Sequence, residues 1–498
     1  MIGRTERWQE DLFVAGPLRD LVPNDHLLKR VDRVLDLSWL RGEVAALYDE
    51  SRGRPSIDPE AAARLMLAGF LLGLVKDRHL MREAQVNLAI RWFAGYRLTD
   101  TLPDHSSLTR IRQRWGEAVF AGLFKRIVEQ CVAAGLVKGD IAHIDATLVR
   151  ADVSWESLVQ RHLAEVKAAN DDPGETPSSE GDGPDDPDDD SPGSQRPREG
   201  RSRAGKPKKY SPTDPDATLA TASKQYRMEP CFKQHTAVDD QVGIIVDVQV
   251  TTGEASEGRE LERQIERIEA MIGQPLEAVT CDAGYAHAAN YGLLEARGIE
   301  AIIPPQKMPR HGRGLPMALF QYDARHQIVR CPAGQVLTRR GRSSDGQGWM
   351  HHAGKAICQA CHHVRNCVPP SAKARVIRVS DHYEALLRAR RRHRQRDERY
   401  VQLYRRHRWR SEGVHGEMKS MHGLRRAVRR GLANMRVQSL LTATVINLKR
   451  MAKAAESLLR SNLTRYAVAT RLTIRKRQPA NVINADLTHA MRQHLLAA

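Results

Sequence analysis

The sequence predicts a mixed α/β protein whose main sheet is flanked by helices, and three patterns along the chain predict it. Residues 140–306 alternate between short β-branched runs and amphipathic stretches, in the order strand, insertion, strand, strand, helix, strand, helix, strand. Residues 1–137 have a mostly helical pattern, and residues 307–400 interrupt the α/β pattern with a cysteine cluster and an arginine-rich helix. These patterns indicate helices packed on a mixed sheet, with an all-α region before it and a small Cys-rich insertion within it.

The chain has 498 residues, which is enough for several domains. Shifts in composition divide it into four expected parts: a helical N-terminal domain (1–137), an α/β domain (138–306 and 401–456), a Cys-cluster insertion with a basic helix (307–400) and a basic C-terminal tail (457–498).

The first clear helix start lies in the N-terminal region. Asp58 is the expected N-cap, because Pro59 follows it at the first helical position. The apolar run 65–75 in this helix has about 11 residues, whereas a membrane span needs about 20. We therefore expect a buried helix here and no membrane span.

A second helix start lies at Asp104 or Ser106, either of which can cap a short basic helix. Arg110, Arg112 and Arg114 follow within this helix. We expect these arginines to contact DNA phosphates, and a solvated helix face is the alternative.

The α/β region is predicted from local patterns of β-branched and amphipathic segments. The expected elements are a strand at 142–149, a helix at 156–170, a hairpin at 231–253, a helix at 258–273, a strand at 276–281, a helix at 287–298, a strand at 299–305 and a long helical stretch from about 399 to 456. The segment 171–207 is rich in Asp, Pro, Gly and Ser, then Arg and Lys, and is expected to be a disordered insertion.

The charge of the chain indicates a polyanionic partner. The net charge is +18, although residues 171–190 alone contain ten acids and no base. Such a basic chain favours nucleic acid as the partner, and a basic soluble protein without one is the alternative. The residues after Met1 contain no apolar leader segment, and seven cysteines do not form a secreted disulfide framework. We therefore expect a cytoplasmic protein with access to DNA.

Two aspartates lie at neighbouring points of the expected sheet. Asp145 lies within the strand 142–149, and Asp282 ends the strand 276–281, with Gly284 allowing a close turn after it. Two aspartates on adjacent strands raise each other's pKa unless a cation lies between them, and such oxygen ligands suit Mg²⁺. Each aspartate taken alone is more simply an ordinary strand-end or cap residue, whereas the two together, in this order of elements, favour a metal site.

A third carboxylate is expected on the helix near residue 412. At about 100° per residue, Glu412 lies in one narrow stripe with four other polar residues, whereas Glu417 lies on the far side. The stripe consists of Tyr404, Arg408, Glu412, His415 and Lys419. It suits a metal-binding carboxylate flanked by phosphate-binding cations. The alternative is a solvated face in which Arg408 and Glu412 form an i,i+4 pair.

These segments together resemble the DDE-type transposases of bacterial insertion sequences. "HIDATLVRAD", "CDAGYAH" and "RWRSEGVHGEMK" match the regions around the three acids of that family. The spacing Arg408-x3-Glu412-x6-Lys419 is similar to the Tyr–Arg–Glu–Lys signature of one branch, from which Tyr404 departs by one residue. "GRPSIDPEAAARLMLAGFLLGL", "RWFAGYRLTDTLPDHSSLTRIRQRWG" and "CPAGQVL" are similar to other segments of this group, so the resemblance covers most of the chain.

The resemblance implies a ribonuclease H-like catalytic domain and an N-terminal domain that helps to bind the ends of the element. It implies that Asp145, Asp282 and Glu412 hold Mg²⁺, or Mn²⁺ in its place, while Arg408 and Lys419 hold DNA phosphates. The implied reaction is hydrolysis at the transposon ends, followed by attack of the exposed 3′-hydroxyls on target DNA. The implied partners are the terminal inverted repeats, the target DNA and further copies of the chain assembled on DNA, near the bacterial nucleoid.

A cysteine cluster lies in the insertion. Cys358 and Cys361 have the spacing of one half of a zinc site, and Cys331 and Cys367 are the candidates for the other half. We expect a structural Zn²⁺, and reduced cysteines without a metal are the alternative.

The stretch 388–430 contains 16 Lys and Arg residues against four acids. Phosphate contact is the simplest interpretation of this density, and Arg425 and Arg426 are further candidates for it. An exposed helix without a ligand is the alternative.

Two other functions remain open beside DNA cleavage with strand transfer. One is a catalytically inactive relative that only binds DNA, and the other is a ribonuclease H-like nuclease that does not join strands. Acids at all three expected places favour an active enzyme.

Overall fold

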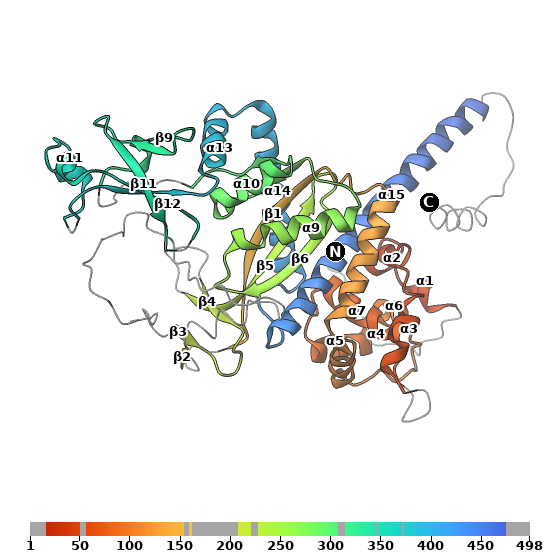
Figure 1. Ribbon diagram of the computed structural model, residues 1–498. Helices are drawn as coiled ribbons and strands as arrows, with labels where there is room; N and C mark the ends of the chain where they lie inside the picture. Colours follow the sequence, from red (N-terminus) through yellow and green to blue (C-terminus); the bar gives the residue numbers. More distant parts are fainter. Residues whose placement is uncertain are drawn as a thin grey trace, which may run out of the picture. The chain divides into compact units, whose positions relative to one another are not determined.

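A computed structural model describes residues 16–49, 56–153, 159–161, 208–220, 228–306, 314–344, 346–370 and 372–474 (Figure 1). Within these residues the chain divides into two compact units. The first contains residues 16–124, 421–423 and 444–474, and the second contains residues 125–420 and 424–443.

The first unit is helical in its described residues. Its elements are α1 (Leu18–Leu21), α2 (Leu27–Asp32), α3 (Leu40–Val44), η1 (Ala45–Leu47), α4 (Pro59–Leu71), α5 (Asp77–Val86), α6 (Leu88–Phe93) and the first part of α7 (His105–Ala133). Oδ1 of Asp58 accepts hydrogen bonds from the amides of Glu60 and Ala61, which confirms the predicted N-cap. The apolar run that follows is buried. Helix α4 ends before Gly73, whose φ of 74° favours a residue without a side chain.

Helix α7 begins with the second predicted cap. Oδ1 of Asp104 accepts the amide of Ser106 at 2.8 Å, so Asp104 rather than Ser106 supplies the capping oxygen. At Gly116 the helix breaks, because φ there is 64°. The described residues contain no helix that is long and apolar enough to cross a membrane.

The second unit is built on a six-stranded mixed sheet. Its strands are β1 (Ile141–Arg150), β4 (Thr218–Ala220), β5 (Glu229–Asp239), β6 (Ile245–Thr252), β7 (Ala278–Thr280) and β8 (Glu300–Ile302). Strand β1 lies at the centre, antiparallel to β5 and parallel to β7. Strands β4 and β6 pair antiparallel with β5, and β8 pairs parallel with β7. The predicted mixed α/β class is thereby confirmed.

Helices cover this sheet. They are η3 (Glu257–Glu260), α9 (Leu261–Ile272), η4 (Ala283–Tyr285), α10 (Ala288–Ala296), α13 (Tyr383–Gln395), α14 (Glu398–Met421) and α15 (Leu432–Ile474), of which α15 extends into the first unit. Figure 1 shows α9 in front of β5 and β6. Helix α9 buries Leu261, Ile265 and Ile268, whose 3–4 residue spacing keeps them on one side.

Helix α14 packs on the face of β1 that carries the odd-numbered residues. Tyr400 and Leu403 form a cluster with Ile141 and two residues of the neighbouring strands. Because side chains alternate along a strand, His143 and Asp145 share this face with Ile141. Guanidinium groups anchor the helix, since Arg410 donates to the backbone oxygens of residues 240 and 241.

Most predicted elements of the α/β region are confirmed: the hairpin of β5 and β6, helix α9, strand β7, helix α10 and strand β8. One prediction is wrong within the segment 156–170, because β2 (Val159–Arg161) is a strand that pairs with β3 (Lys208–Tyr210). That edge pairing is a long-range contact that local helical spacing does not reveal. The rest of this segment, and the insertion 171–207, lie outside the described residues.

The long helical stretch predicted from about 399 to 456 is two helices. Helix α14 ends at Met421, and α15 begins at Leu432. Gly423 and Gly431 have φ values of 75° and 87°, which a helix cannot accommodate. Residues 457–474, at the start of the predicted basic tail, continue α15.

A five-stranded antiparallel sheet follows the α/β sheet in the chain. Its strands are β9 (Gln321–Asp323), β10 (Ile328–Arg330), β11 (Val336–Arg342), β12 (Gly348–His352) and β13 (Val376–Ser380). Three short helices belong to the same stretch of the chain: η5 (Met317–Leu319), α11 (Lys355–Gln359) and α12 (Val364–Cys367). Its core includes Val329, Leu337 and Ile377, and Tyr383 of α13 packs against them.

Candidate active site

Asp145 and Asp282 lie at matching positions on two parallel strands. The last residue pair between β1 and β7 is His143 with Thr280. Each aspartate follows two residues later, so both side chains leave the sheet at the same level. Adjacent strands are about 4.8 Å apart, which brings two carboxylates from distant parts of the chain side by side.

Asp282 is held in a strongly negative environment. Its Oδ1 accepts the amide of Gly284 at 2.8 Å. Burial raises the pKa of Asp282 to about 6, and the negative charges of Glu257 and Asp145 add to this effect. A buried carboxylate beside like charges is the environment expected of a cation ligand.

Asp145 differs because a histidine faces it. Burial by itself would raise the pKa of Asp145, but the hydrogen bond from His415 and the charges of His415 and His407 outweigh burial and lower it. Nδ1 of His415 lies 3.4 Å from Oδ2 of Asp145. Asp145 therefore stays ionised next to Asp282.

Glu412 points away from this pair of aspartates. Its side chain is 63% exposed and lies 3.1 Å from the guanidinium of Arg408. Counting about 100° per residue from Tyr404, the buried positions of α14 centre near about −40°, whereas Glu412 lies at about 80°. The predicted stripe is therefore the border of the buried face rather than its centre.

Tyr404 is affected by the charges of both Glu412 and Asp282. The pKa of Tyr404 is raised by burial, and then by the negative charges of Asp282 and Glu412. Both carboxylates thus act on the same hydroxyl. In the described part of the chain, no three His, Cys, Asp or Glu side chains are grouped tightly enough to hold a metal ion as they stand.

The other members of the predicted stripe occupy different environments. His415 is 7% exposed and faces Asp145, so it does not lie on the surface. Lys419 is half-buried, and burial lowers its pKa while the charge of Asp145 opposes that effect. Arg425 is exposed, and exposed Arg426 pairs with Asp152 at 3.1 Å.

The three arginines predicted on the N-terminal helix separate in the first unit. Arg112 is buried and forms an ion pair with Asp77. Arg110 is exposed, and the guanidinium of Arg114 lies 4.6 Å from the ring centre of Tyr48. A helix rotates about 200° over two residues, so Arg112 lies on the side opposite to the other two. The burial of Arg112 leaves Arg110 and Arg114 as the phosphate-contact candidates on this helix.

Glu257 is a site residue that the sequence did not indicate. It begins η3, directly before helix α9, and its charge acts on Asp282. An acid in the first turn of a helix is ordinary, and no motif links this position to the aspartates. Only the folded sheet brings them together.

The four predicted zinc ligands all belong to the region of the five-stranded sheet, but as they stand in the described residues they are not grouped tightly enough to hold a metal ion. Cys331 follows β10, Cys358 is in α11, Cys361 lies between the short helices, and Cys367 ends α12. Burial raises the pKa of Cys367, and the charges of the other three thiols raise it further. Sγ of Cys358 accepts the amide of Arg375 at 3.5 Å, and all four cysteines are reduced.

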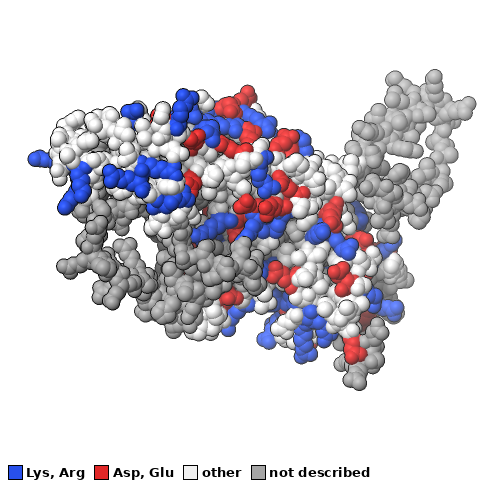
Figure 2. All heavy atoms as spheres, viewed as in Figure 1, with Lys and Arg blue, Asp and Glu red and all other residues white. Residues whose placement is uncertain are grey.

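Several arginines of the dense stretch 388–430 pair with acids of the same unit. Arg388 bonds to both carboxylate oxygens of Glu295, and Arg399 bonds to Glu300 at 2.8 Å. Figure 2 shows that basic and acidic side chains are interspersed on this face of the molecule. Some arginines of the stretch 388–430 therefore stabilise the fold through ion pairs rather than binding phosphate.

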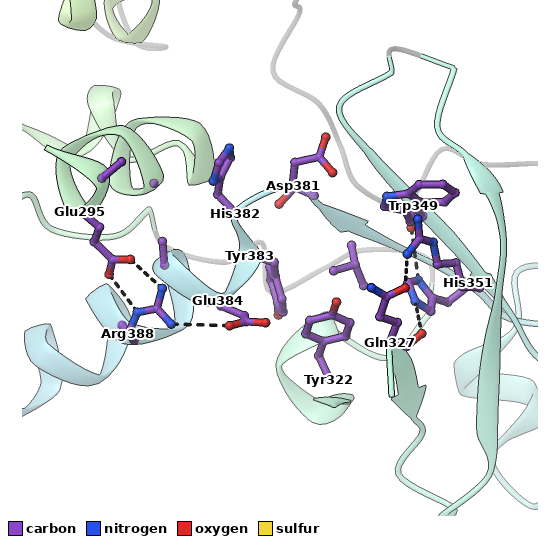
Figure 3. A pocket seen from close by; sticks show the side chains of 16 residues that line it. Glu295, Tyr322, Gln327, Trp349, His351, Asp381, His382, Tyr383, Glu384 and Arg388 are labelled. Atoms are coloured by element: carbon purple, nitrogen blue, oxygen red, sulfur yellow. Dashed lines mark hydrogen bonds and ion pairs between the residues drawn. The ribbon is translucent and has the colours of Figure 1, made fainter. Parts of the chain in front are cut away.

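A cavity of about 540 Å³ lies between the five-stranded sheet and helices α10 and α13 (Figure 3). Aromatic side chains, including Tyr322 and Tyr383, form part of its wall. Three of its charged residues are paired with one another, because Arg388 contacts both Glu295 and Glu384. None of the predicted catalytic acids lines it.

Two family models match the chain. One, described as a transposase domain (DUF772), matches residues 16–114, and the other, described as a transposase DDE domain, matches residues 330–452. The second match includes Glu412 and the four clustered cysteines, whereas Asp145 and Asp282 lie outside both. No curated protein matches the chain. These two transposase domains, in this order along the chain, support its identification as a DDE-type transposase.

Proposed function

We propose that this transposase cleaves DNA at the ends of an insertion sequence and joins the exposed 3′-hydroxyls to target DNA. The placement of Asp145 and Asp282 at one level of two parallel strands carries the proposal. If β4 is set aside as a short edge strand, Asp145 is on the first strand of the sheet in chain order and Asp282 follows the fourth. The family has its first two acids at these places in a ribonuclease H-like fold, and this agreement supports such a fold here.

Asp145, Asp282 and Glu412 are the residues that would hold divalent ions, Mg²⁺ or Mn²⁺. The raised pKa of Asp282 fits this role, because a buried carboxylate beside like charges gains from a cation. The carboxylate of Glu412 would have to turn from Arg408 toward the aspartates. Divalent ions held there would stabilise the attacking and leaving oxygens of a phosphodiester.

The remaining residues of the site would position the DNA. Arg408 and Lys419 flank the acids on α14 and would hold phosphates of the cleaved strand. His415 would orient Asp145 instead of touching DNA. Arg110 and Arg114 of the first unit, and Arg425 of the second, are exposed or partly exposed cations that would contact phosphates of inverted repeats or target DNA. Binding two ends at once would require several copies of the chain.

We further propose that Cys331, Cys358, Cys361 and Cys367 hold one structural Zn²⁺. The charges of Cys331, Cys358 and Cys361 act on the buried Cys367, which supports this assignment, and the four thiols would have to move closer together to hold the ion. Metal analysis of the purified chain should find about one zinc per chain, and this content should fall when Cys361 is replaced by Ser. Protein that folds fully and contains no zinc would refute the assignment.

The test of the main proposal uses the full chain, Mg²⁺ and linear DNA carrying the sequences that flank its own gene. Nicking at the ends, 3′-hydroxyl products and joining to a second DNA are the expected results. Binding without nicking would identify an inactive DNA-binding relative, and nicking without joining would identify a nuclease. Asp145→Asn should abolish nicking and preserve binding, while Glu269→Gln, a half-buried acid paired with Arg297 elsewhere in this unit, serves as the matched control.

A further inference from the structure

One carboxylate oxygen of Glu257 lies near a lysine, and the other faces the candidate active site. Its Oε1 lies 3.3 Å from Nζ of Lys233 on β5. Its Oε2 faces the turn after β7, where a Cβ placed on Gly284 would lie 2.5 Å from this oxygen and 3.0 Å from Oδ1 of Asp282. The carboxylates of Glu257 and Asp282 therefore border the same point, and the absent side chain of Gly284 leaves room for both.

The backbone beside Glu257 is fixed against the same turn. A Cβ on Gly258 would lie 2.9 Å from Nε2 of His287 and 3.0 Å from Nδ2 of Asn290. This close approach holds η3 against the start of α10, the helix that follows Asp282. Nζ of Lys233 also donates to the carbonyl of Ala255 at 2.7 Å, which further restricts the segment leading to Glu257.

A buried hydroxyl at the same place indicates that a further group belongs there. Tyr285 is 0% exposed, and within the described residues its hydroxyl has no hydrogen-bond partner. The pKa of Tyr285 is raised by burial, and among the charges that raise it further are those of Glu257, Asp145 and Asp282. Tyr285 ends the short helix that Asp282 caps, and a buried hydroxyl without a partner is destabilising.

We propose that Glu257 is a fourth carboxylate of the divalent-cation site and contributes its Oε2 beside Asp282. The inference rests on the proposed function, because that function places the cation at Asp145 and Asp282. It assigns Glu257 a position in the site that the three-acid pattern lacks.

Pairing with Lys233 alone does not account for Glu257. Lys233 supplies one positive charge, whereas Glu257 and Asp282 together supply two negative charges. The excess negative charge is what a divalent cation would neutralise.

The test measures Mn²⁺ binding to the full chain without DNA, by the electron paramagnetic resonance signal of the free ion. Glu257→Gln removes the charge and retains the shape, and it should weaken Mn²⁺ binding about tenfold or more. Asp282→Asn should weaken it at least as much, and the control Glu269→Gln should bind as the unaltered chain does. The melting temperature without metal checks that each variant folds.

The outcomes separate the two proposals. If Glu257→Gln binds Mn²⁺ like the control while Asp282→Asn binds weakly, Glu257 is only the partner of Lys233 and the proposed function stands. If Asp282→Asn also binds normally, the cation site itself is wrong. Lys233→Gln provides an independent test. Without Lys233, Glu257 loses its ion-pair partner, so this variant should bind Mn²⁺ at least as tightly as the unaltered chain does. Weaker binding by Lys233→Gln would overturn the assignment of Glu257.

Discussion

Nδ1 of His415 lies 3.4 Å from Oδ2 of Asp145 and thereby joins helix α14 to the central strand β1. Both side chains are largely enclosed, and within the described residues Nε2 of His415 is buried without a hydrogen-bond partner. The imidazole therefore contacts the carboxylate within the protein interior. It connects the helix that carries Glu412 to the strand that carries Asp145.

Replacing His415 by Ala should lower DNA cleavage about 10- to 100-fold, because an oriented ligand loses its supporting hydrogen bond. DNA affinity and its dependence on salt should remain unchanged, as measured by titration at several salt concentrations. His351→Ala, which removes a buried imidazole from the five-stranded sheet, controls for general loosening of the fold. A salt slope reduced by about 1 would instead indicate a phosphate contact from His415.

Replacing Glu412 by Gln should lower cleavage by at least about 100-fold while DNA binding persists, because the neutral amide is a weak ligand for a divalent ion. Replacing Arg408 by Gln should mainly reduce DNA affinity. Single-turnover cleavage at saturating protein distinguishes the two effects. Glu417→Gln, on the other side of α14, is the matched control, and an equal loss in this variant would show that the helix rather than the site has been damaged.

Local patterns were sufficient to predict every strand of the six-stranded sheet except β4, and the placement of Asp145 next to Asp282. Strand ends that carry aspartates become neighbours once two parallel strands pair, so no detailed packing is needed. The rotation of α14 about its axis was not predictable in this way. Periodicity placed Glu412 and His415 in one stripe, but the sheet buries the edge of that stripe near His415 and leaves Glu412 exposed.

Glu257 and Arg112 show what sequence patterns miss. The position of Glu257 depends on how η3 meets the turn at Gly284, and this contact joins segments with no shared motif. Arg112 looked equivalent to Arg110 and Arg114 in composition. Its burial depends on Asp77, which belongs to another helix.

Replacing Gly284 by Ala should disturb the candidate site directly, because the new methyl would lie 2.5 Å from Oε2 of Glu257. That distance is too short, so the carboxylates of Glu257 and Asp282 must move apart. We expect the free energy of unfolding to fall by about 1–3 kcal/mol and Mn²⁺ affinity to fall with it. Gly413→Ala, where a methyl would meet open space on α14, is the control. Normal Mn²⁺ binding by Gly284→Ala would show that this turn does not border the cation site.

Replacing Arg112 by Gln should destabilise the first unit, because it leaves the buried carboxylate of Asp77 without its main cation. Breaking such a pair costs about 3 kcal/mol or more, measurable by urea denaturation. Arg110→Gln removes an exposed charge and should change stability by less than about 0.5 kcal/mol. Its expected effect is a salt slope of DNA binding reduced by about 1. The reverse result, with Arg112→Gln stable and defective only in DNA binding, would restore the phosphate-contact role that the sequence predicted for Arg112.

Acid should destabilise the second unit through His407, which lies on α14 and contacts Thr280 at 2.9 Å. Burial lowers the pKa of His407 to about 4, and the charge of Asp145 opposes this only in part. The unfolded chain binds a proton near pH 6.5, whereas the folded chain does so near pH 4. Stability from this difference is complete above pH 6.5 and is lost as pH falls toward 4, by about 3 kcal/mol at most.

The measurement compares urea denaturation of the unaltered chain and of His407→Gln between pH 4 and 8. The difference in stability should shrink as the pH falls, because the variant has no imidazole to protonate. Groups with a raised pKa, such as Asp282, act in the opposite direction in both proteins and cancel in the comparison. Ser411→Ala, which removes an uncharged neighbour 3.3 Å from the ring, should lower stability by an amount that hardly depends on pH. If the difference in stability between the unaltered chain and His407→Gln does not change with pH, the imidazole is protonated as easily in the folded chain as in the unfolded one. In that case α14 does not shield His407 from solvent on this face of the sheet.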